Sequence, residues 1–315
     1  MESLNRLAIE LVDEALEFAE ELNIGAYELE NEATVVDFGL EFDGGIEAGL
    51  LCTEIQTAGL ATPGRDLGTV AGVPLPYVEL STDQPALALL CAQKASWEVT
   101  TDDFEGLGSG PARALVAQET EFQRIGYTDA FDLTALAVES EQAPTASAAQ
   151  QVANLAEVEV SGVFLLAFSS ASLVGSVTNA TRVAELATFN LTELGYNPLD
   201  IVSATGRAPV PPVPADEETA IGRANDAIAY GGTAHLVVRE DFDAFDRVIS
   251  EASTEYGRPF VEVFDDQGWS FEETPASLFG PAAVTIDVLG GPTYQYGSTD
   301  ESVLATSFGL EDKSD

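Results

Sequence analysis

Residues 133–138, Leu-Thr-Ala-Leu-Ala-Val, have the pattern of a buried strand, and a helix-forming segment, 146–156, and a second strand, 163–168, follow them. Short apolar runs bounded by polar residues predict strands, and apolar residues three and four apart predict amphipathic helices. The same alternation continues along the chain and predicts the α/β class. The other expected strands are 27–30, 34–38, 77–80, 97–101, 201–204, 234–238, 260–264 and 283–288. The other expected helices are one from Leu4 to Leu22, then 46–57, 85–94, 177–194, 217–229 and 242–255.

The length of 315 residues allows one large or two modest domains with a sizeable core. We expect a first α/β lobe over residues 1–145 and a second over residues 146–310, with the hinge between Pro144 and Glu159. The last residues, 311–315, are expected to form an acidic tail.

Acidic residues dominate the chain, with 54 Asp and Glu against 12 Lys and Arg and a formal net charge of −42. Such a chain repels itself in dilute buffer, but near 1 M salt the Debye length falls to about 3 Å and the carboxylates are screened. The acids are scattered and the chain is 45% apolar, which favours a folded protein over a disordered one. We interpret the composition as that of a cytoplasmic protein from an extreme halophile.

The sequence also argues against several classes of partner. It has no basic patch that could neutralise nucleic-acid phosphates, and no apolar run approaches the roughly 20 residues of a membrane span. The N-terminal helix lacks the basic start and cleavage site of a signal peptide. Cys52 and Cys91 are isolated in apolar stretches and His235 is the single histidine, so we expect buried thiols and no metal site.

Lys94 is the first functional candidate because the chain has only two lysines, Lys94 and Lys313. A solvated position could have been filled by one of the many acids, so the retention of Lys94 inside the chain needs a reason. The structural alternative is a lysine that complements a helix C-terminus, an effect of roughly a few tenths of a kcal/mol.

A glycine-rich junction over residues 106–113, Gly-Leu-Gly-Ser-Gly-Pro-Ala-Arg, follows a strand-like segment and enters a helix. Such a junction offers backbone N–H groups to an anion, and Arg113 favours that role because arginine is scarce here. Pro111 stands where a dinucleotide fingerprint needs its third glycine, which argues against a nicotinamide enzyme. A tight turn before a helix is the structural alternative.

Arg182 and Glu185 lie three residues apart on an expected helix, so their side chains share one face. A solvated ion pair would contribute almost nothing at high salt, and the rarity of arginine again suggests a function for Arg182. From the pattern alone, a surface ion pair and a functional pair remain equal alternatives. Two other junctions, 204–209 and 225–233, carry glycines; in the second the glycines have a sufficient structural role, ending a helix before a strand.

Several short motifs, taken in order, resemble methenyltetrahydromethanopterin cyclohydrolases. The resemblance covers nearly the whole chain, although Arg207 and the acidic stretch 212–218 depart from the family pattern. The motifs that carry it are 92–95 (Ala-Gln-Lys-Ala), 108–115 (Gly-Ser-Gly-Pro-Ala-Arg-Ala-Leu), 174–177 (Val-Gly-Ser-Val), 182–185 (Arg-Val-Ala-Glu), 204–206 (Ala-Thr-Gly), 228–233 (Ile-Ala-Tyr-Gly-Gly-Thr) and 307–310 (Ser-Phe-Gly-Leu).

The resemblance implies a homotrimer of two-lobed α/β subunits, a pterin substrate bound in the cleft between the lobes, and no metal or redox cofactor. The substrate would be a tetrahydromethanopterin or tetrahydrofolate derivative, whose methenyl bridge is reversibly hydrolysed to a formyl group. The catalytic positions of the family correspond to Lys94, Arg182 and Glu185, with Glu185 as the base. The implied substrate-binding residues are Gly108, Ser109, Gly110, Arg113, Ser176, Thr205, Gly206, Tyr230, Gly231, Gly232 and Thr233, with residues 108–113 at the anionic tail of the substrate.

Two other functions stay open at this point. One is a protein that carries a pterin without converting it, and the other is an enzyme that reads the phosphates of a nucleotide through its glycine junctions. Loss of the methenyl absorption supports the cyclohydrolase, binding without that loss supports the carrier, and a nucleotide retained through purification supports the third.

Overall fold

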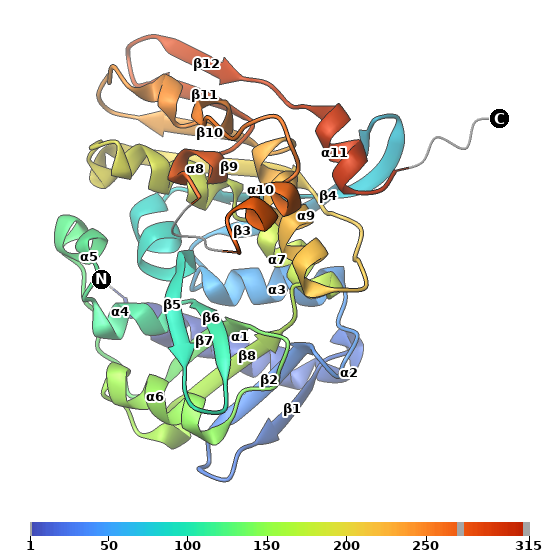
Figure 1. The fold of residues 1–315 in the computed structure, drawn as a ribbon. Coiled ribbons are helices and arrows are strands. Elements are labelled where there is room, and N and C mark those ends of the chain that lie inside the picture. Colours follow the sequence, from blue (N-terminus) through green and yellow to red (C-terminus); the bar gives the residue numbers. More distant parts are fainter. Residues whose placement is uncertain (1, 270–273, 311–315) are drawn as a thin grey trace. The chain divides into compact units, whose positions relative to one another are not determined.

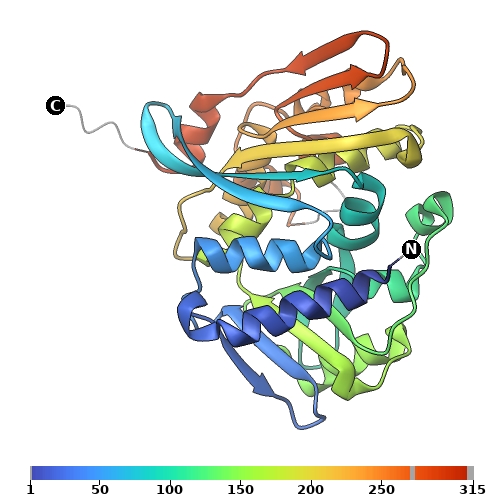
Figure 2. The same cartoon turned by 180° about the vertical axis from the view of Figure 1, so that it is seen from behind.

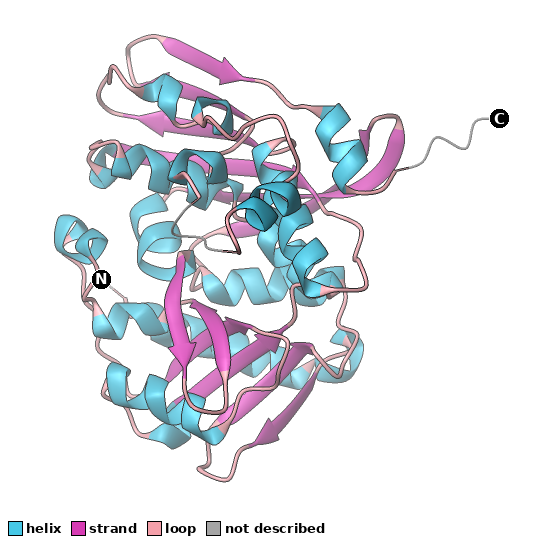
Figure 3. Cartoon of the chain, in the orientation of Figure 1, coloured by secondary structure: helices cyan, strands magenta, loops and turns pink. Residues whose placement is uncertain are grey.

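The computed structural model describes residues 2–269 and 274–310, which form two compact units (Figure 1). Unit 1 consists of Met1–Thr62 and Ala86–Thr178, and unit 2 of Pro63–Pro85 and Asn179–Asp315. Each unit contains a six-stranded sheet with helices, so the predicted α/β class is confirmed (Figure 3). The acidic tail expected over residues 311–315 lies outside the described residues.

The chain divides between the units at other points than the boundary expected at residue 145. Strands β7 (Thr134–Glu139) and β8 (Val163–Phe168) are parallel neighbours in one sheet, and α6 (Ala146–Ala156) connects them. The expected hinge therefore lies inside a single strand, helix, strand unit, where hydrogen bonds join both flanking strands. The segment Pro63–Pro85 instead leaves unit 1 and adds a hairpin to the sheet of unit 2.

The unit 1 sheet has the strand order β1-β2-β8-β7-β6-β5. Its three central strands, β2, β8 and β7, are parallel, and the others pair antiparallel with their neighbours. The strands expected over 27–30 and 34–38 are present as β1 and β2, which pair antiparallel. The remaining strands are β1 (Gly25–Glu28), β2 (Thr34–Gly39), β5 (Ala95–Thr100) and β6 (Glu105–Ser109).

Helices cover both faces of this sheet because successive strand residues point to opposite sides. Ala135 and Ala137 of β7 pack in the core under α1 and α3, whereas Leu136 and Val138 pack in the core under α6. Figure 2 shows α1 and α3 beside each other on the first face. The helices of unit 1, besides α6, are α1 (Leu4–Glu17), α2 (Ala19–Leu22), α3 (Ile46–Gln56), η1 (Ala86–Gln93), α4 (Ala112–Val116), α5 (Thr120–Ile125), η2 (Val160–Gly162) and most of α7 (Leu173–Ala180).

The unit 2 sheet has the strand order β12-β11-β10-β9-β4-β3, with β10 and β11 as its parallel pair. Its strands are β3 (Thr62–Val70), β4 (Val73–Thr82), β9 (Ile201–Pro209), β10 (Thr233–Val238), β11 (Ala283–Val288) and β12 (Thr293–Gly297). Its helices are α8 (Val183–Glu193), η3 (Pro198–Asp200), α9 (Glu217–Ala229), η4 (Phe245–Arg247), η5 (Ser250–Ala252), α10 (Phe260–Asp266), η6 (Ala276–Phe279) and α11 (Glu301–Ser307). No helix within 2–269 or 274–310 is long and apolar enough to cross a membrane.

Several predicted elements of the second half of the chain differ from the structure. The expected strand 260–264 is the helix α10, because Phe260, Val263 and Phe264 are buried at helical spacing. The expected helix 242–255 is reduced to the short turns η4 and η5. The expected helix 177–194 is interrupted, since α7 ends at Ala180 and α8 begins at Val183.

Candidate functional site

Lys94 follows directly after η1, which is a π-helix rather than an α-helix. The backbone N–H of Lys94 donates to the carbonyl of Leu89, five residues earlier, at 2.8 Å. All eight residues of η1 are buried. Because π-helices are rare and frequently occur at functional sites, this local structure supports the interest in Lys94.

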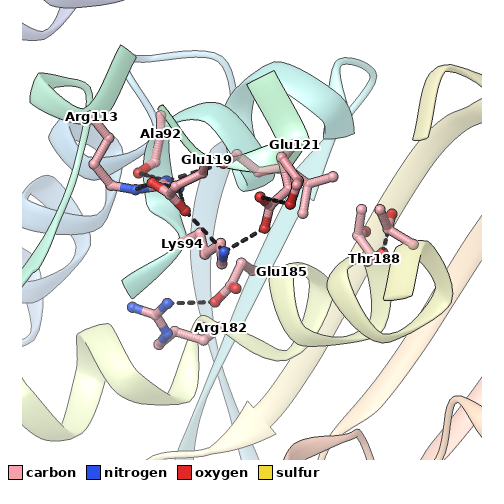
Figure 4. Close-up of polar contacts among 11 residues, drawn as sticks. Ala92, Lys94, Arg113, Glu119, Glu121, Arg182, Glu185 and Thr188 are labelled. Atoms are coloured by element: carbon pink, nitrogen blue, oxygen red, sulfur yellow. Dashed lines mark hydrogen bonds and ion pairs between the residues drawn. The ribbon is translucent and has the colours of Figure 1, made fainter. Parts of the chain in front are cut away.

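The ammonium of Lys94 lies between two carboxylates in unit 1 (Figure 4). Lys94 Nζ is 3.0 Å from Glu119 Oε2 and also donates to Glu121 Oε1. The side chain of Glu121 is only 4% exposed and that of Lys94 is 15% exposed. This is therefore a mostly buried ion pair, unlike the solvated pairs of an acidic surface.

Arg113 binds the same carboxylate from the other side. Its Nε and Nη2 donate to Glu119, with Nη2 at 2.7 Å from both carboxylate oxygens, and its Nη1 donates to the carbonyls of Leu90 and Ala92 at 3.0 and 3.3 Å. Burial would raise the pKa of Glu119, but the charges and hydrogen bonds of Arg113 and Lys94 outweigh it and lower that pKa to about 2. Glu119 is therefore ionised throughout the physiological range.

The glycine-rich junction before Arg113 satisfies the end of η1. The hydroxyl of Ser109 donates to the carbonyl of Gln93, and the N–H of Gly110 donates to the carbonyl of Ala92 at 3.0 Å. Gly110 needs its φ of +137°, which side chains disfavour, and a Cβ on Gly108 would approach the carbonyl of Trp97 to 3.0 Å. These contacts are those of a tight turn before a helix, the structural alternative. They do not support binding of the anionic tail of the substrate by Arg113, because its N–H groups bind partners inside unit 1.

Arg182 and Glu185 form a close ion pair at the start of α8 in unit 2 (Figure 4). Arg182 Nη2 is 2.5 Å from Glu185 Oε2, and the side chains are 11% and 2% exposed. Arg182 is the N-cap residue of α8, and Glu185 lies in its first turn, where the helix dipole favours a carboxylate. Of the two alternatives left open by the sequence, the solvated surface pair is excluded by this burial.

Two of the predicted glycines determine how closely α8 packs on its sheet. A Cβ on Gly206 of β9 would lie 2.3 Å from the backbone nitrogen of Ala184, and a Cβ on Gly232 would lie 3.1 Å from Val183 Cγ2. Both contacts fall on the turn of α8 between Arg182 and Glu185. The glycines therefore position the residue pair through the backbone.

The other predicted substrate-binding residues have varied settings. The hydroxyl of Tyr230 donates to the carbonyl of Arg258 at 2.7 Å and its ring is fully buried in the core, so its contacts are those of a core residue. Gly231 packs against Pro209, whereas Thr205 pairs with His235 across β9 and β10. Thr233 is exposed on β10, and Ser176 is buried on α7.

The side chains of the types that bind metals lie apart from one another in the described part of the structure. Cys52 and Cys91 are buried free thiols, and burial raises the pKa of Cys91 to about 12. His235 is exposed on β10. Among the residues that the structure describes, no three His, Cys, Asp or Glu side chains are grouped so that they could hold a metal ion.

Comparison with known proteins settles the family. The family model described as "Cyclohydrolase (MCH)" matches residues 3–308. A methenyltetrahydromethanopterin cyclohydrolase of Halobacterium salinarum is 57% identical over 310 residues, which cover 98% of this chain and 100% of that protein. The chain belongs to the MCH cyclohydrolase family. Cyclohydrolases of the same name from Methanosphaerula palustris (98% of this chain and 100% of that protein) and Methanocella arvoryzae (99% of each) are 38% and 37% identical.

Sequence reasoning missed Glu119 and Glu121 of this MCH chain. Both are ordinary members of a set of 54 acidic residues, and no motif distinguishes them. The spacing Glu-Thr-Glu three residues after the end of α4 gives no chemical signal by itself. Only the fold, which brings α5 against η1, shows that these two carboxylates meet Lys94.

Proposed function

We propose that this chain is an enzyme that reversibly hydrolyses the methenyl bridge of methenyltetrahydromethanopterin, or of a folate equivalent, to the formyl derivative. The observation that carries the proposal is the full-length identity of 57% to a protein of that name. The buried Arg182–Glu185 pair supports it, because a carboxylate shielded from water and fixed by a cation has the setting of a proton-transfer group.

Glu185 is the proposed general base. The methenyl bridge is a delocalised cation, so a water molecule that adds to its carbon must lose a proton, and a carboxylate within hydrogen-bond reach accepts it. The tetrahedral adduct then breaks one carbon–nitrogen bond. Glu185, now protonated, returns the proton to the departing ring nitrogen, and the formyl group stays on the other nitrogen. The hydroxyl of the adduct loses its own proton to water as the formyl C=O forms, so hydrolysis of the cation releases one proton overall, and the steps need only water and side chains.

Arg182 and Lys94 are proposed to act as fixed charges. Arg182 holds the Glu185 carboxylate through one N–H to oxygen contact and so restricts its orientation. Lys94 would stabilise an oxygen of the substrate or of the adduct. This stabilisation requires that its ammonium is held in a fixed position. The substrate is the proposed small-molecule partner, and nucleic acid, membrane and a resident metal play no part in the proposal.

An absorption assay tests this function. Purified protein in molar salt is mixed with the methenyl forms of tetrahydromethanopterin and tetrahydrofolate, and the methenyl absorption is followed. Catalysed loss of that absorption is expected with at least one of them. Binding of both pterins without any catalysed loss would favour the carrier, and a co-purified nucleotide would favour the nucleotide enzyme.

We also propose that the protein works as a cytoplasmic homotrimer in a halophile; its net charge of −42 supports the halophile, and the family resemblance supports the trimer. Dilution from molar to tenth-molar salt should then loosen the fold and dissociate the trimer, because screening of the carboxylates weakens. Circular dichroism and light scattering across that range measure both effects. Unchanged folding and assembly in dilute salt would contradict the halophile interpretation.

A further inference from the structure

Unit 1 contains four charged side chains in one connected network: Arg113 binds Glu119, Glu119 binds Lys94, and Lys94 binds Glu121. Their charges sum to zero, with two cations and two carboxylates. We propose that Arg113, Glu119 and Glu121 are positioning residues that fix the ammonium of Lys94 for the reaction. The proposal rests on the proposed cyclohydrolase function and assigns roles to three side chains beside Lys94.

Arg113 fixes the backbone to which Lys94 is attached. Its Nη1 donates to the carbonyls of Leu90 and Ala92 in the last turn of η1, where carbonyls lack intrahelical donors. The same guanidinium donates hydrogen bonds from Nε and Nη2 to the carboxylate of Glu119. One buried side chain therefore links the main chain next to Lys94 with the carboxylate that holds the tip of Lys94.

The two carboxylates fix the direction of the ammonium. An ammonium has three N–H donors, and Glu119 and Glu121 accept two of them. With two donors bound to two fixed carboxylates, the ammonium is held against rotation about the Cε–Nζ bond, so its orientation is fixed. A free lysine side chain has many rotamers, and this arrangement removes that freedom before a substrate binds.

Burial allows the network to survive the salt that the composition implies. The side chains of Arg113 and Glu121 are 1% and 4% exposed, and buried pairs are screened far less than surface pairs. Glu121 accepts hydrogen bonds from Lys94 and from the hydroxyl of Thr120. Burial of a carboxylate without a cation costs free energy. The position of Glu121 beside Lys94 is therefore best explained if Glu121 holds the ammonium of Lys94 in place.

Kinetics provide the first test. Glu121→Gln and Glu119→Gln should each lower kcat by about 10- to 100-fold with little change in KM, because a misplaced catalytic group affects the reaction more than binding. Glu119→Asp, which keeps the charge, should recover part of the loss. The matched control is Glu255→Gln: Glu255 binds Arg258 in unit 2 at 2.8 Å with 32% side-chain exposure, against 31% for Glu119, and its loss should leave turnover unchanged.

Chemical labelling gives a readout that is independent of activity. The chain has two lysines, so reductive methylation followed by mass spectrometry compares Lys94 directly with Lys313 in the same molecule. Glu119→Gln and Glu121→Gln should raise the labelling rate of Lys94 relative to Lys313 several-fold, and Glu255→Gln should not. Melting temperatures close to that of the unmodified protein distinguish release of Lys94 from general unfolding.

The two readouts separate the possible failures. If the unmodified protein lacks cyclohydrolase activity, the proposed function fails, while the labelling rates still show whether the carboxylates restrain Lys94. If the protein is active, but both glutamine variants keep normal turnover and an unchanged Lys94 labelling rate, the positioning role is contradicted. Faster labelling with normal turnover would also contradict the positioning role, because the restraint of Lys94 would then have no effect on the reaction.

Discussion

The Lys94 network of unit 1 and the Arg182–Glu185 pair of unit 2 both bury charge, but they hold it by different means. Around Lys94, four charged side chains and the capped end of a π-helix fix one another. In unit 2, Arg182 Nη2 lies 2.5 Å from Glu185 Oε2, and the pair is carried by the first turn of α8, which packs closely on Gly206 and Gly232.

The two arrangements suit different roles. A fixed charge must keep one protonation state, whereas a proton-transfer group must change its protonation state. A network whose charges are all matched resists protonation, as the pKa of about 2 at Glu119 shows. A carboxylate that takes and returns a proton needs a weaker hold on its ionised form. The comparison is consistent with the proposed roles, fixed charge for the Lys94 network and proton transfer for Glu185.

The largest expected effect is that of Glu185→Gln. The amide keeps the shape and reach of the side chain but cannot accept a proton, so kcat should fall by a factor on the order of 10² to 10⁴. Pterin binding and the melting temperature should change little. Steady-state absorption kinetics, pterin titration and thermal unfolding measure the three quantities.

Glu255→Gln is the matched control for this variant as well. Glu255 and Arg258 are also three residues apart and 2.8 Å from each other, but their side chains are 32% and 35% exposed. Normal turnover of Glu255→Gln with loss in Glu185→Gln assigns the effect to the buried pair. Near-normal turnover of both would reduce Arg182–Glu185 to a structural ion pair.

A smaller effect is expected from Gly206→Ala, which tests how unit 2 positions its pair. The new Cβ would lie 2.3 Å from the nitrogen of Ala184, so the start of α8 must shift, at a cost of about 1–3 kcal/mol of stability. Turnover should fall by about tenfold or more because a small misplacement of Glu185 slows proton transfer.

Gly64→Ala is the control for this substitution, because a Cβ on Gly64 would meet nothing within 4 Å. Its unfolding free energy and turnover should match those of the unmodified chain. If Gly206→Ala behaves like Gly64→Ala, the glycine does not set the position of α8.

The smallest expected effect concerns Asp226, a buried carboxylate of unit 2 with a pKa of about 7. Burial raises this pKa above its ordinary value of 3.8, and its hydrogen-bond donors in the described part of the chain, Phe260 N–H and the Ser307 hydroxyl, are neutral and only partly offset it. It is thus the opposite of Glu119, where cations lower the pKa.

The sign of the pH effect follows from the raised pKa. Between the unfolded value near 3.8 and the folded value of about 7, the folded chain binds the extra proton, so the stability from this group falls as pH rises and levels off above pH 7. Asp226→Asn should remove a slope on the order of 1 kcal/mol per pH unit at most. Denaturant unfolding at fixed molar salt measures it, and an unchanged slope in the variant would show that Asp226 is already ionised.

Local pattern was sufficient for much of the fold. Apolar strand runs such as 134–138 and 163–168, and the helix between them, follow from side-chain periodicity alone. Lys94, Arg182 and Glu185 could be selected because basic residues are scarce in this chain and the motifs around them resemble the family.

Other features depend on contacts that the sequence does not encode locally. The junction 108–113 has the composition of an anion-binding loop, yet its donors cap a π-helix that ends at Gln93, far back in the chain. The π-helix itself has the composition of a buried α-helix. The hinge was expected at residues 144–159 from the alternation of strands and helices, whereas the pairing of β7 with β8 places this stretch inside one unit.

The most direct test of the central claim, that Glu185 transfers the proton, is chemical rescue of Glu185→Ala. Turnover of the methenyl substrate is measured with increasing formate at constant molar ionic strength, with the unmodified chain as reference. We expect almost no turnover without formate and a saturable recovery with it, because the small carboxylate replaces the missing base. Substantial turnover of Glu185→Ala without formate would contradict the account.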